Sequence, residues 1–466
     1  MPNSIAFLAL AVFPVVVVAL YRRLPADRAL IWSLLLGYLF LPEPPAVFDL
    51  PLMPPFNKHN IPVLAAFMVA HSRYGKQESI LPQSGVGKLL MLTFIFSPII
   101  TVVANHEPVF FGRVGLPGLG AKDAVALTLQ QFLLVLPFLM ARQHLQSGGA
   151  LRDIAMALMI GGLVYSLLML VEIRLSPQVN QWVYGYFQHS FVQTLRFGGY
   201  RPMVFLYHGI WVAFFTMSAV VSAYALWRYE EGGAKWKLFF AALYLTAILV
   251  LAKSLGSLVF MVLLVPMVVL LSTRQQVRIA IVIASLALAY PILKGADLVP
   301  QEKLLAQAAS IDPQRAGSLQ FRFDNENILL DRAYIKPIFG WGSWGRNHIL
   351  DPINGNIVTV TDGRWIIVIG VYGWVGFIAE FGLLLLPILL VGREVKFATP
   401  ALVISPMIGP LSLLLAINAL DMLPNATLTP LTWLLAGALT GYAENLRSRR
   451  LRGPEQAPSP RRKPMM

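Results

Sequence analysis

The sequence predicts an all-α polytopic membrane protein, because apolar residues are abundant, charged residues are scarce, and the apolar runs are long enough to span a bilayer. Of the 466 residues, 57% are hydrophobic and 13% are charged, and the mean hydropathy is +0.65. Soluble domains carry about 25% charged residues. A spanning helix needs about 20 apolar residues, and most long segments of this chain approach that length. Folding as a water-soluble protein is therefore excluded.

Thirteen apolar segments are predicted to form the membrane-spanning helices. They are residues 5–21, 29–42, 59–71, 88–104, 122–141, 152–175, 203–227, 237–252, 255–271, 278–295, 365–391, 401–420 and 427–445. The third is short and follows a proline-rich stretch, so it could be a half-helix, which leaves a count of twelve or thirteen. The first has no preceding positive charge and no cleavage site, so it is interpreted as a retained helix and not a signal peptide.

The distribution of positive charge predicts the orientation of these segments. Lys and Arg concentrate in alternate connections: Arg22, Arg23 and Arg28; Arg73 and Lys76; Arg142 and Arg152; Arg228, Lys235 and Lys237; Arg274 and Arg278; Arg393 and Lys396. The tail after Leu446 is basic and falls in phase with them. By the positive-inside rule these connections and the C-terminus are cytoplasmic, where anionic lipids attract them. The net charge of +14 therefore does not indicate nucleic-acid binding, since no domain carries a basic face.

The same pattern divides the chain into four regions. N-terminal transmembrane helices occupy residues 1–295, a large non-cytoplasmic loop 296–364, C-terminal transmembrane helices 365–445, and a basic cytoplasmic tail 446–466. Within the loop, residues 321–336 are predicted to form a helix that ends before Pro337. The following stretch is rich in Gly and Trp and is predicted to turn at the membrane interface.

The first candidate site precedes and enters the seventh span. Arg196 and Arg201 can bind phosphate through planar, permanently charged guanidinium groups. His208 is expected one or two turns into the helix, facing protein or a polar cavity. The alternative is that the arginines extend to the interface and that the histidine is an ordinary buried residue.

The second candidate site is the large loop. Arg322 with Glu326, and Arg332 with Lys336, are each one helical turn apart, which is also what a solvated amphipathic helix would show. Three further arginines add positive charge: Arg315, Arg346 and Arg364.

Metal and buried-charge chemistry are constrained by composition. The chain has no cysteine, so thiol and zinc–thiolate chemistry are excluded. No convincing metal site is found, because no His and carboxylate pair has metal-ligand spacing. Asp351 and Asp362 could bind a divalent ion, but loop aspartates more often form turns. Glu380 lies near the middle of the eleventh span and needs a partner there; it is either paired with a buried arginine or catalytic.

Several of these features resemble the O-antigen ligase and O-antigen polymerase superfamily. Arg322, followed by Pro337-Ile338-Phe339-Gly340-Trp341-Gly342, is similar to the family's loop block of an arginine and a P-hydrophobic-hydrophobic-G-x-G sequence. The family continues with a short polar motif and a helix of spaced glycines. Here these are Thr361-Asp362-Gly363-Arg364-Trp365 and Gly370, Gly373 and Gly376. The resemblance covers residues 190–395.

This resemblance implies a GT-C-like fold in the bacterial inner membrane, with the large loop in the periplasm. It implies a metal-independent glycosyltransferase without a cofactor, which transfers glycan from undecaprenyl diphosphate to a glycan, lipid or protein acceptor. Other polysaccharide-assembly proteins are candidate partners. Four arginines are expected to bind the diphosphate: Arg196, Arg201, Arg322 and Arg364. The family usually has His-Asn where this chain has Asp362-Gly363, so the base is expected to be His208, His348 or Asp362.

Three alternatives remain open from the sequence. A polymerase of capsule or exopolysaccharide is favoured over a ligase to lipid A core or protein, because the histidine motif of the ligases is altered. A transporter or flippase of lipid-linked oligosaccharide would need a polar path across the membrane and is disfavoured by the lack of internal repeats. A non-catalytic scaffold would need no essential arginine.

Overall fold

A computed structural model describes residues 1–50, 53–74, 79–196, 198–311, 313–397 and 403–452. This part of the chain is mostly helical, and its strands form only two short hairpins. Eight of the described helices are long and apolar enough to cross a membrane: α1, α4, α5, α6, α8, α9, α11 and α14. Helices α10 and α15 are apolar but shorter. The predicted class, an all-α polytopic membrane protein, is confirmed at this level.

Each of the thirteen predicted segments contains a helix, but α8 begins only after the non-helical residues 203–208 and α15 only after 403–407, later than predicted. The helices are α1 (Ser4–Arg23), α2 (Ala26–Phe40), α3 (Ile61–Tyr74), α4 (Gly85–Val103), α5 (Ala121–His144), α6 (Gly148–Leu175), α8 (Gly209–Tyr229), α9 (Ala234–Leu251), α10 (Leu255–Leu270), α11 (Thr273–Gly295), α14 (Arg364–Lys396), α15 (Ile408–Asp421) and α16 (Pro430–Arg452). The last part of the predicted basic tail, from residue 453, lies outside the described residues. Serine side chains cap α4, α6 and α11 by accepting a backbone N–H of the first turn, which stabilises helix starts.

Smaller elements connect these helices. They are β1 (Val109–Phe111), β2 (Val114–Leu116), α7 (Val179–Tyr184), the 3-10 helix η1 (Phe191–Thr194), β3 (Leu195–Arg196), β4 (Gly199–Tyr200), α12 (Gln301–Ile311) and α13 (Pro313–Tyr334). The strands pair as antiparallel hairpins, β1 with β2 and β3 with β4. The helix predicted over 321–336 is the second half of α13, which ends before Pro337 as expected.

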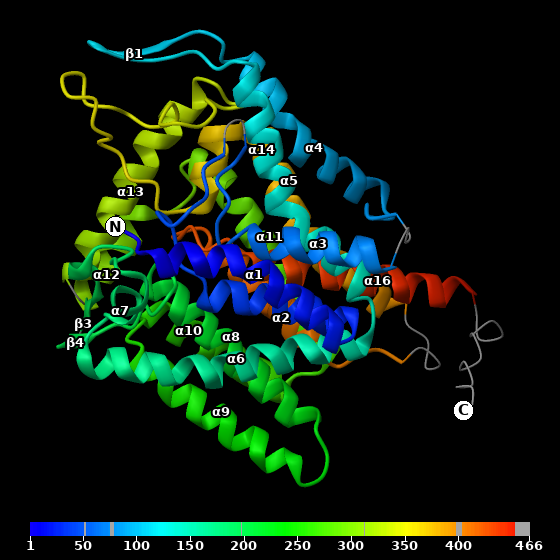
Figure 1. Ribbon diagram of the computed structural model, residues 1–466. Helices are drawn as coiled ribbons and strands as arrows, with labels where there is room; N and C mark the ends of the chain where they lie inside the picture. Colours follow the sequence, from blue (N-terminus) through cyan, green and yellow to red (C-terminus); the bar gives the residue numbers. More distant parts are fainter. Residues whose placement is uncertain (51–52, 75–78, 197, 312, 398–402, 453–466) are drawn as a thin grey trace.

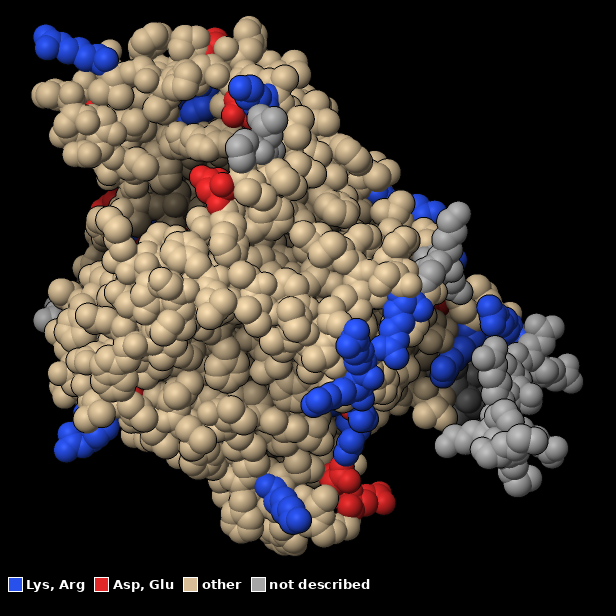
Figure 2. All heavy atoms as spheres, in the orientation of Figure 1, with Lys and Arg blue, Asp and Glu red and all other residues tan. Residues whose placement is uncertain are grey.

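The long helices run between two ends of the molecule, with the N-terminus at the left of Figure 1 and the end of α16 at the right. Basic side chains at the starts of α2 and α6 form ion pairs with acidic side chains of other helices or connections. Arg28 Nε lies 2.9 Å from Asp153 Oδ2, and Arg152 Nη2 lies 2.6 Å from Glu230 Oε2. On the face drawn in Figure 2, Lys and Arg gather around these helix ends, while the middle of the face is almost free of charge.

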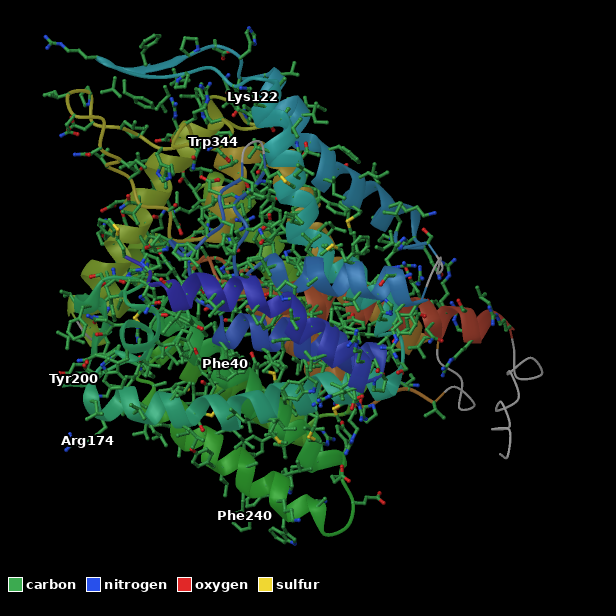
Figure 3. The ribbon with its side chains drawn as sticks, in the orientation of Figure 1. Phe40, Lys122, Arg174, Tyr200, Phe240 and Trp344 are labelled. Atoms are coloured by element: carbon green, nitrogen blue, oxygen red, sulfur yellow. The ribbon has the colours of Figure 1, made fainter. Side chains whose placement is uncertain are left out.

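The opposite end carries the connecting elements. Close to the N-terminus, Asn3 donates its backbone N–H to Tyr184 O. The hairpin β3–β4, α12 and α13 also lie on this side (Figure 1). Tyr200 and Arg174 mark the same end in Figure 3. The hairpin β1–β2 projects from the upper left of Figure 1.

Apolar side chains are distributed as the membrane environment requires. The central helices α8 and α14 are 78% and 67% buried over their apolar windows, while α1 and α9 are only 28% buried. Apolar residues of the outer helices are therefore exposed, as at Leu8 (61%) and Phe240 (64%). Soluble monomers rarely expose contiguous apolar surface on this scale, so these helices are suited to lipid contact.

Helix α14 is interrupted at Gly373, which corrects the prediction of one continuous helix over 365–391. Gly373 has φ +67° and ψ −168°, a conformation essentially restricted to glycine. Its backbone packs against the 337–342 stretch: Trp374 N–H donates to Pro337 O over 2.8 Å, and a Cβ on Gly373 would lie 2.3 Å from Ile338 O. The 337–342 stretch and the helix of spaced glycines, both noted in the sequence as parts of one motif, thus contact each other through the backbone.

Candidate functional site

The hairpin β3–β4 places two arginines side by side. Arg196 ends β3, and Arg201 follows β4, with its backbone N–H donated to Thr194 O over 2.8 Å. The Arg201 residue is only 8% exposed. Its Nη2 donates to Lys253 O over 3.2 Å, while its buried Nε has no hydrogen-bond partner. Burial and the neighbouring Arg196 lower the pKa of Arg201 to about 10, so the group stays charged at neutral pH.

His208 lies immediately before α8, not one or two turns inside the helix as predicted. The helix begins at Gly209, and His208 is its N-cap. The ring Nδ1 accepts the Ile210 backbone N–H over 3.1 Å, and Nε2 lies 3.0 Å from Gln193 Oε1. Since an acceptor Nδ1 leaves the ring proton on Nε2, that proton is directed at Gln193. Burial, His189 and Arg201 lower the pKa of His208 to about 3.

The segment between Arg201 and His208 is non-helical and held by buried side chains. Glu172 Oε2 accepts the backbone N–H groups of Met203 and Val204 over 2.7 and 2.8 Å. Lys58 Nζ donates to Phe205 O over 2.7 Å. Such pairing satisfies backbone groups that no helix satisfies, and it fixes the segment in place.

Helix α13 brings a third arginine to the same region. Arg322 Nε lies 3.2 Å from Asp362 Oδ2, and the two side chains are 35% and 37% exposed. Asn325 Oδ1 accepts the Val360 backbone N–H over 2.7 Å, which holds the 360–362 stretch against α13. One turn from Arg322, Glu326 Oε2 accepts Tyr290 Oη–H over 3.0 Å, so α13 is fixed on α11.

These segments enclose one cavity of about 710 Å³. It brings together five of the seven predicted site residues: Arg196, Arg201, His208, Arg322 and Asp362. The remaining lining residues are His189, Gln193, Tyr207, Ile210, Trp211, Ser318, Leu319, Val360, Thr361, Pro424, Asn425, Ala426 and Thr427. The cavity lining contains three guanidinium groups and one carboxylate. Its net positive charge is suited to an anion.

The other two predicted site residues do not line this cavity. His348 Nδ1 lies 3.1 Å from Thr359 Oγ1, within the loop that follows α13. Arg364 Nε and Nη2 each lie 2.6 Å from the carboxylate oxygens of Glu380. A straight helix would separate residues 364 and 380 by about 24 Å, so the interruption of α14 is what allows this pair to form. The fully buried Glu380 thus has as its partner an arginine whose side chain is 19% exposed, which agrees with pairing, one of the two possibilities that the sequence left open.

The remaining loop cations have structural contacts. The Arg332 guanidinium lies 3.6 Å from the Trp341 ring centroid, Arg346 Nη1 donates to Pro117 O over 2.7 Å, and Lys336 Nζ donates to the backbone at the end of α4 over 2.8 Å. Arg332 and Lys336 thus make tertiary contacts in place of the intrahelical pairs of a solvated helix that the sequence offered as the alternative. The side chain of Arg315 lies outside the described residues.

Asp351 has the turn-forming role that its position in the loop indicated. Its Oδ1 accepts the backbone N–H groups of Ile353 and Asn354 over 2.8 and 2.9 Å. Both contacts are of the kind that stabilise an Asx turn. Asp362, in contrast, directs its carboxylate toward Arg322 in the cavity wall.

Sequence reasoning missed the neutral part of the cavity wall. His189, Tyr207 and Trp211 supply aromatic rings, and Gln193 and Asn425 supply amides. None of these residues belongs to a recognisable motif. The sequence indicated only that they lie in or beside loops predicted to be on the outer side of the membrane.

A narrow apolar pocket adjoins the cavity. Its volume is about 40 Å³, and it shares Trp211 and Thr427 with the cavity wall. A further pocket of about 10 Å³ shares Leu158, Leu431 and Leu435 with the first. Together they form an apolar row between α2, α6, α8, α15 and α16 that begins at the polar cavity.

No protein-family model and no curated protein matches this chain. Its function is therefore inferred from the chemistry of the cavity and from the resemblance noted in the sequence.

Proposed function

We propose that the protein is a membrane glycosyltransferase of the polysaccharide polymerase or ligase type. It would transfer glycan from undecaprenyl diphosphate to an acceptor hydroxyl at the periplasmic face of the bacterial inner membrane. The observation that carries the proposal is the convergence of three arginines, from the β3–β4 hairpin and α13, on one cavity that borders an apolar row. The undecaprenyl donor itself comes from the family resemblance.

The arginines suit a diphosphate. Planar guanidinium groups bind phosphate oxygens through paired hydrogen bonds. Among the described residues, no carboxylate forms an ion pair with Arg201, and its buried Nε still lacks a partner. A buried cation in this state gains more from an anionic ligand than an exposed one would. In the reaction the same charges would stabilise the diphosphate as it leaves.

Asp362 is the base that the geometry favours. His208 carries its ring proton on Nε2 and its other nitrogen accepts a backbone N–H, so neither nitrogen is ready to take a proton. His348 does not line the cavity. The acceptor hydroxyl oxygen would attack the anomeric carbon, the bond from that carbon to the phosphate oxygen would break, and the hydroxyl proton would pass to Asp362.

The same arrangement supports a position for the lipid tail of the donor and an orientation of the helices in the membrane. The isoprenoid tail would leave the cavity on the side of Trp211, where the lining becomes apolar. The thirteen helices would all span the membrane, with the 296–364 loop in the periplasm and α16 ending in the cytoplasm, because the basic residues gather at the end opposite the cavity. A transporter is less favoured, since the polar cavity meets apolar residues at Trp211.

The proposal is tested with the purified protein in nanodiscs and undecaprenyl-diphosphate-linked repeat units from the source strain. Release of undecaprenyl diphosphate and glycan length are followed with a chelator present. Release with lengthening glycan would establish a polymerase, and release that requires a separate acceptor would establish a ligase. No release from an authenticated donor, with or without acceptor, would contradict the enzymatic proposal and favour the transporter or scaffold.

A further inference from the structure

A row of three aromatic rings forms one wall of the cavity. The ring centroids of His189 and Tyr207 are 4.9 Å apart, and those of Tyr207 and Trp211 are 6.0 Å apart. All three residues line the cavity, and Tyr207 is 43% exposed. Trp211 also lines the apolar pocket, so the row extends from the apolar end of the cavity into its polar part.

Tyr207 is held rigidly although it is exposed. The preceding residues 203–206 are at most 6% exposed. Besides the contacts of Glu172 and Lys58, Gln188 Nε2 donates to both Val204 O and Leu206 O over 2.9 Å. An aromatic side chain on such a fixed segment loses little conformational entropy when it binds a ligand.

Amide and hydroxyl groups surround the aromatic wall. Gln193, Asn425 and Thr361 line the same cavity. An amide can donate and accept hydrogen bonds at once, as can a hydroxyl group. An exposed aromatic face beside such groups is suited to a sugar ring, whose C–H face is apolar and whose edge carries hydroxyls.

The charges of the cavity restrict which sugar fits. Arg196, Arg201 and Arg322 contribute three positive charges and Asp362 one negative charge. A diphosphate diester carries about two negative charges, which this excess would neutralise. Burial lowers the pKa of His189 and of His208, so neither adds a positive charge at neutral pH. No cation of the lining is then left to pair with a carboxylate on the sugar.

We infer that the sugar attached to the diphosphate is uncharged and stacks on Tyr207. This inference rests on the proposed function and extends it to the substrate class: a neutral sugar, not a uronic acid, at the donor diphosphate. Trp211 would lie at the junction with the lipid, and Gln193 and Asn425 would bind the hydroxyls.

The test measures binding to the full-length protein in nanodiscs with three synthetic probes: farnesyl diphosphate, farnesyl-diphosphate-linked glucose and farnesyl-diphosphate-linked glucuronic acid. The glucose probe should bind about tenfold more tightly than farnesyl diphosphate, and the glucuronic acid probe should show no such gain. Tyr207→Ala should remove the gain, while Tyr207→Phe keeps it. Trp182→Ala is the matched control, because Trp182 is exposed at the same end but does not line the cavity.

The outcomes separate this inference from the proposed function. An equal gain for both sugar probes, or a gain that survives Tyr207→Ala, would overturn the neutral-sugar inference while leaving the diphosphate site intact. If farnesyl diphosphate itself did not bind, the proposed function would be contradicted, and the inference that rests on it would fail too.

Discussion

Arg322 Nε lies 3.2 Å from Asp362 Oδ2 in the wall of the cavity, although the two residues belong to different segments. Arg322 projects from α13, and Asp362 precedes α14. Each side chain keeps about a third of its surface exposed, so both can still contact a ligand. In the proposed mechanism this pair would place a phosphate-binding guanidinium directly beside the carboxylate that accepts the hydroxyl proton.

Replacing Asp362 should separate chemistry from binding. Asp362→Asn is expected to lower kcat by about 10²- to 10⁴-fold, the usual contribution of a general base, with donor affinity changed little. Thermal stability should hardly change, because such partly exposed ion pairs contribute about 0–1 kcal/mol. Turnover and donor binding are measured together, with Asp351→Asn as the control for a turn-forming loop aspartate. Turnover close to that of the unaltered protein would exclude Asp362 as the base.

Replacing His208 should have a different effect. His208→Asn keeps an N-cap acceptor for Ile210 N–H and should retain most of the activity. The folded-state pKa of His208 is lowered to about 3, below its ordinary value near 6.5. Unfolding therefore takes up a proton over this range, and stability should fall as the pH falls from about 6.5 toward 3. His208→Asn should weaken that acid destabilisation in pH-dependent thermal unfolding. A loss of activity of 100-fold or more would instead identify His208 as the base.

The interruption of α14 should be intolerant of a side chain. Gly373→Ala would require a left-handed conformation that costs about 1–3 kcal/mol, and its Cβ would meet the backbone of Ile338. We expect a marked loss of folded protein and a lower Tm in detergent. Gly317→Ala in α13 is the control, because a Cβ there meets nothing within 4 Å. Equal stability of the two variants would show that the contact between the 337–342 stretch and α14 is dispensable.

The Arg364–Glu380 pair should stabilise the fold without binding the donor. Glu380→Ala leaves the Arg364 guanidinium, which is 19% exposed, without its partner; breaking a fully buried pair typically costs about 3–5 kcal/mol, and the partial exposure reduces this cost. Replacing both residues with apolar ones, Arg364→Met with Glu380→Leu, should restore much of the Tm. Donor binding by the folded double variant distinguishes the roles: retained affinity supports a structural pair, and lost affinity would return Arg364 to the diphosphate site.

The positions of the helices could be predicted from sequence because hydropathy and flanking charge are local properties. Each of the thirteen predicted segments contains a helix, although described residues at the starts of some of them, such as 203–208 and 403–407, are not helical. The start of α8 was misplaced because the apolar residues 203–206 look like helix, whereas Glu172 and Lys58 bind their backbone in another conformation. The interruption at Gly373 was hidden for a similar reason, since it depends on contact with the distant Pro337.

The site could be predicted only in its charged part. Arginines at a membrane boundary are conspicuous in sequence, and Arg196, Arg201 and Arg322 do meet in one cavity. Arg364 also lies at a membrane boundary and was therefore predicted to bind diphosphate. It pairs instead with Glu380, and this pairing depends on the interruption of α14, which the sequence does not reveal. Tyr207 carries no signal at all, because an aromatic residue beside a membrane span is ordinary.

Binding of undecaprenyl diphosphate to the purified protein tests the central claim most directly. Native mass spectrometry would compare it with undecaprenyl monophosphate, in the unaltered protein and in Arg201→Gln. Loss of charged hydrogen bonds should weaken diphosphate binding by about 10- to 100-fold. Arg174→Gln, an exposed arginine at the same end outside the cavity, should leave it unchanged. Diphosphate binding that is as tight in Arg201→Gln as in the unaltered protein would contradict the claim that this cavity holds the donor.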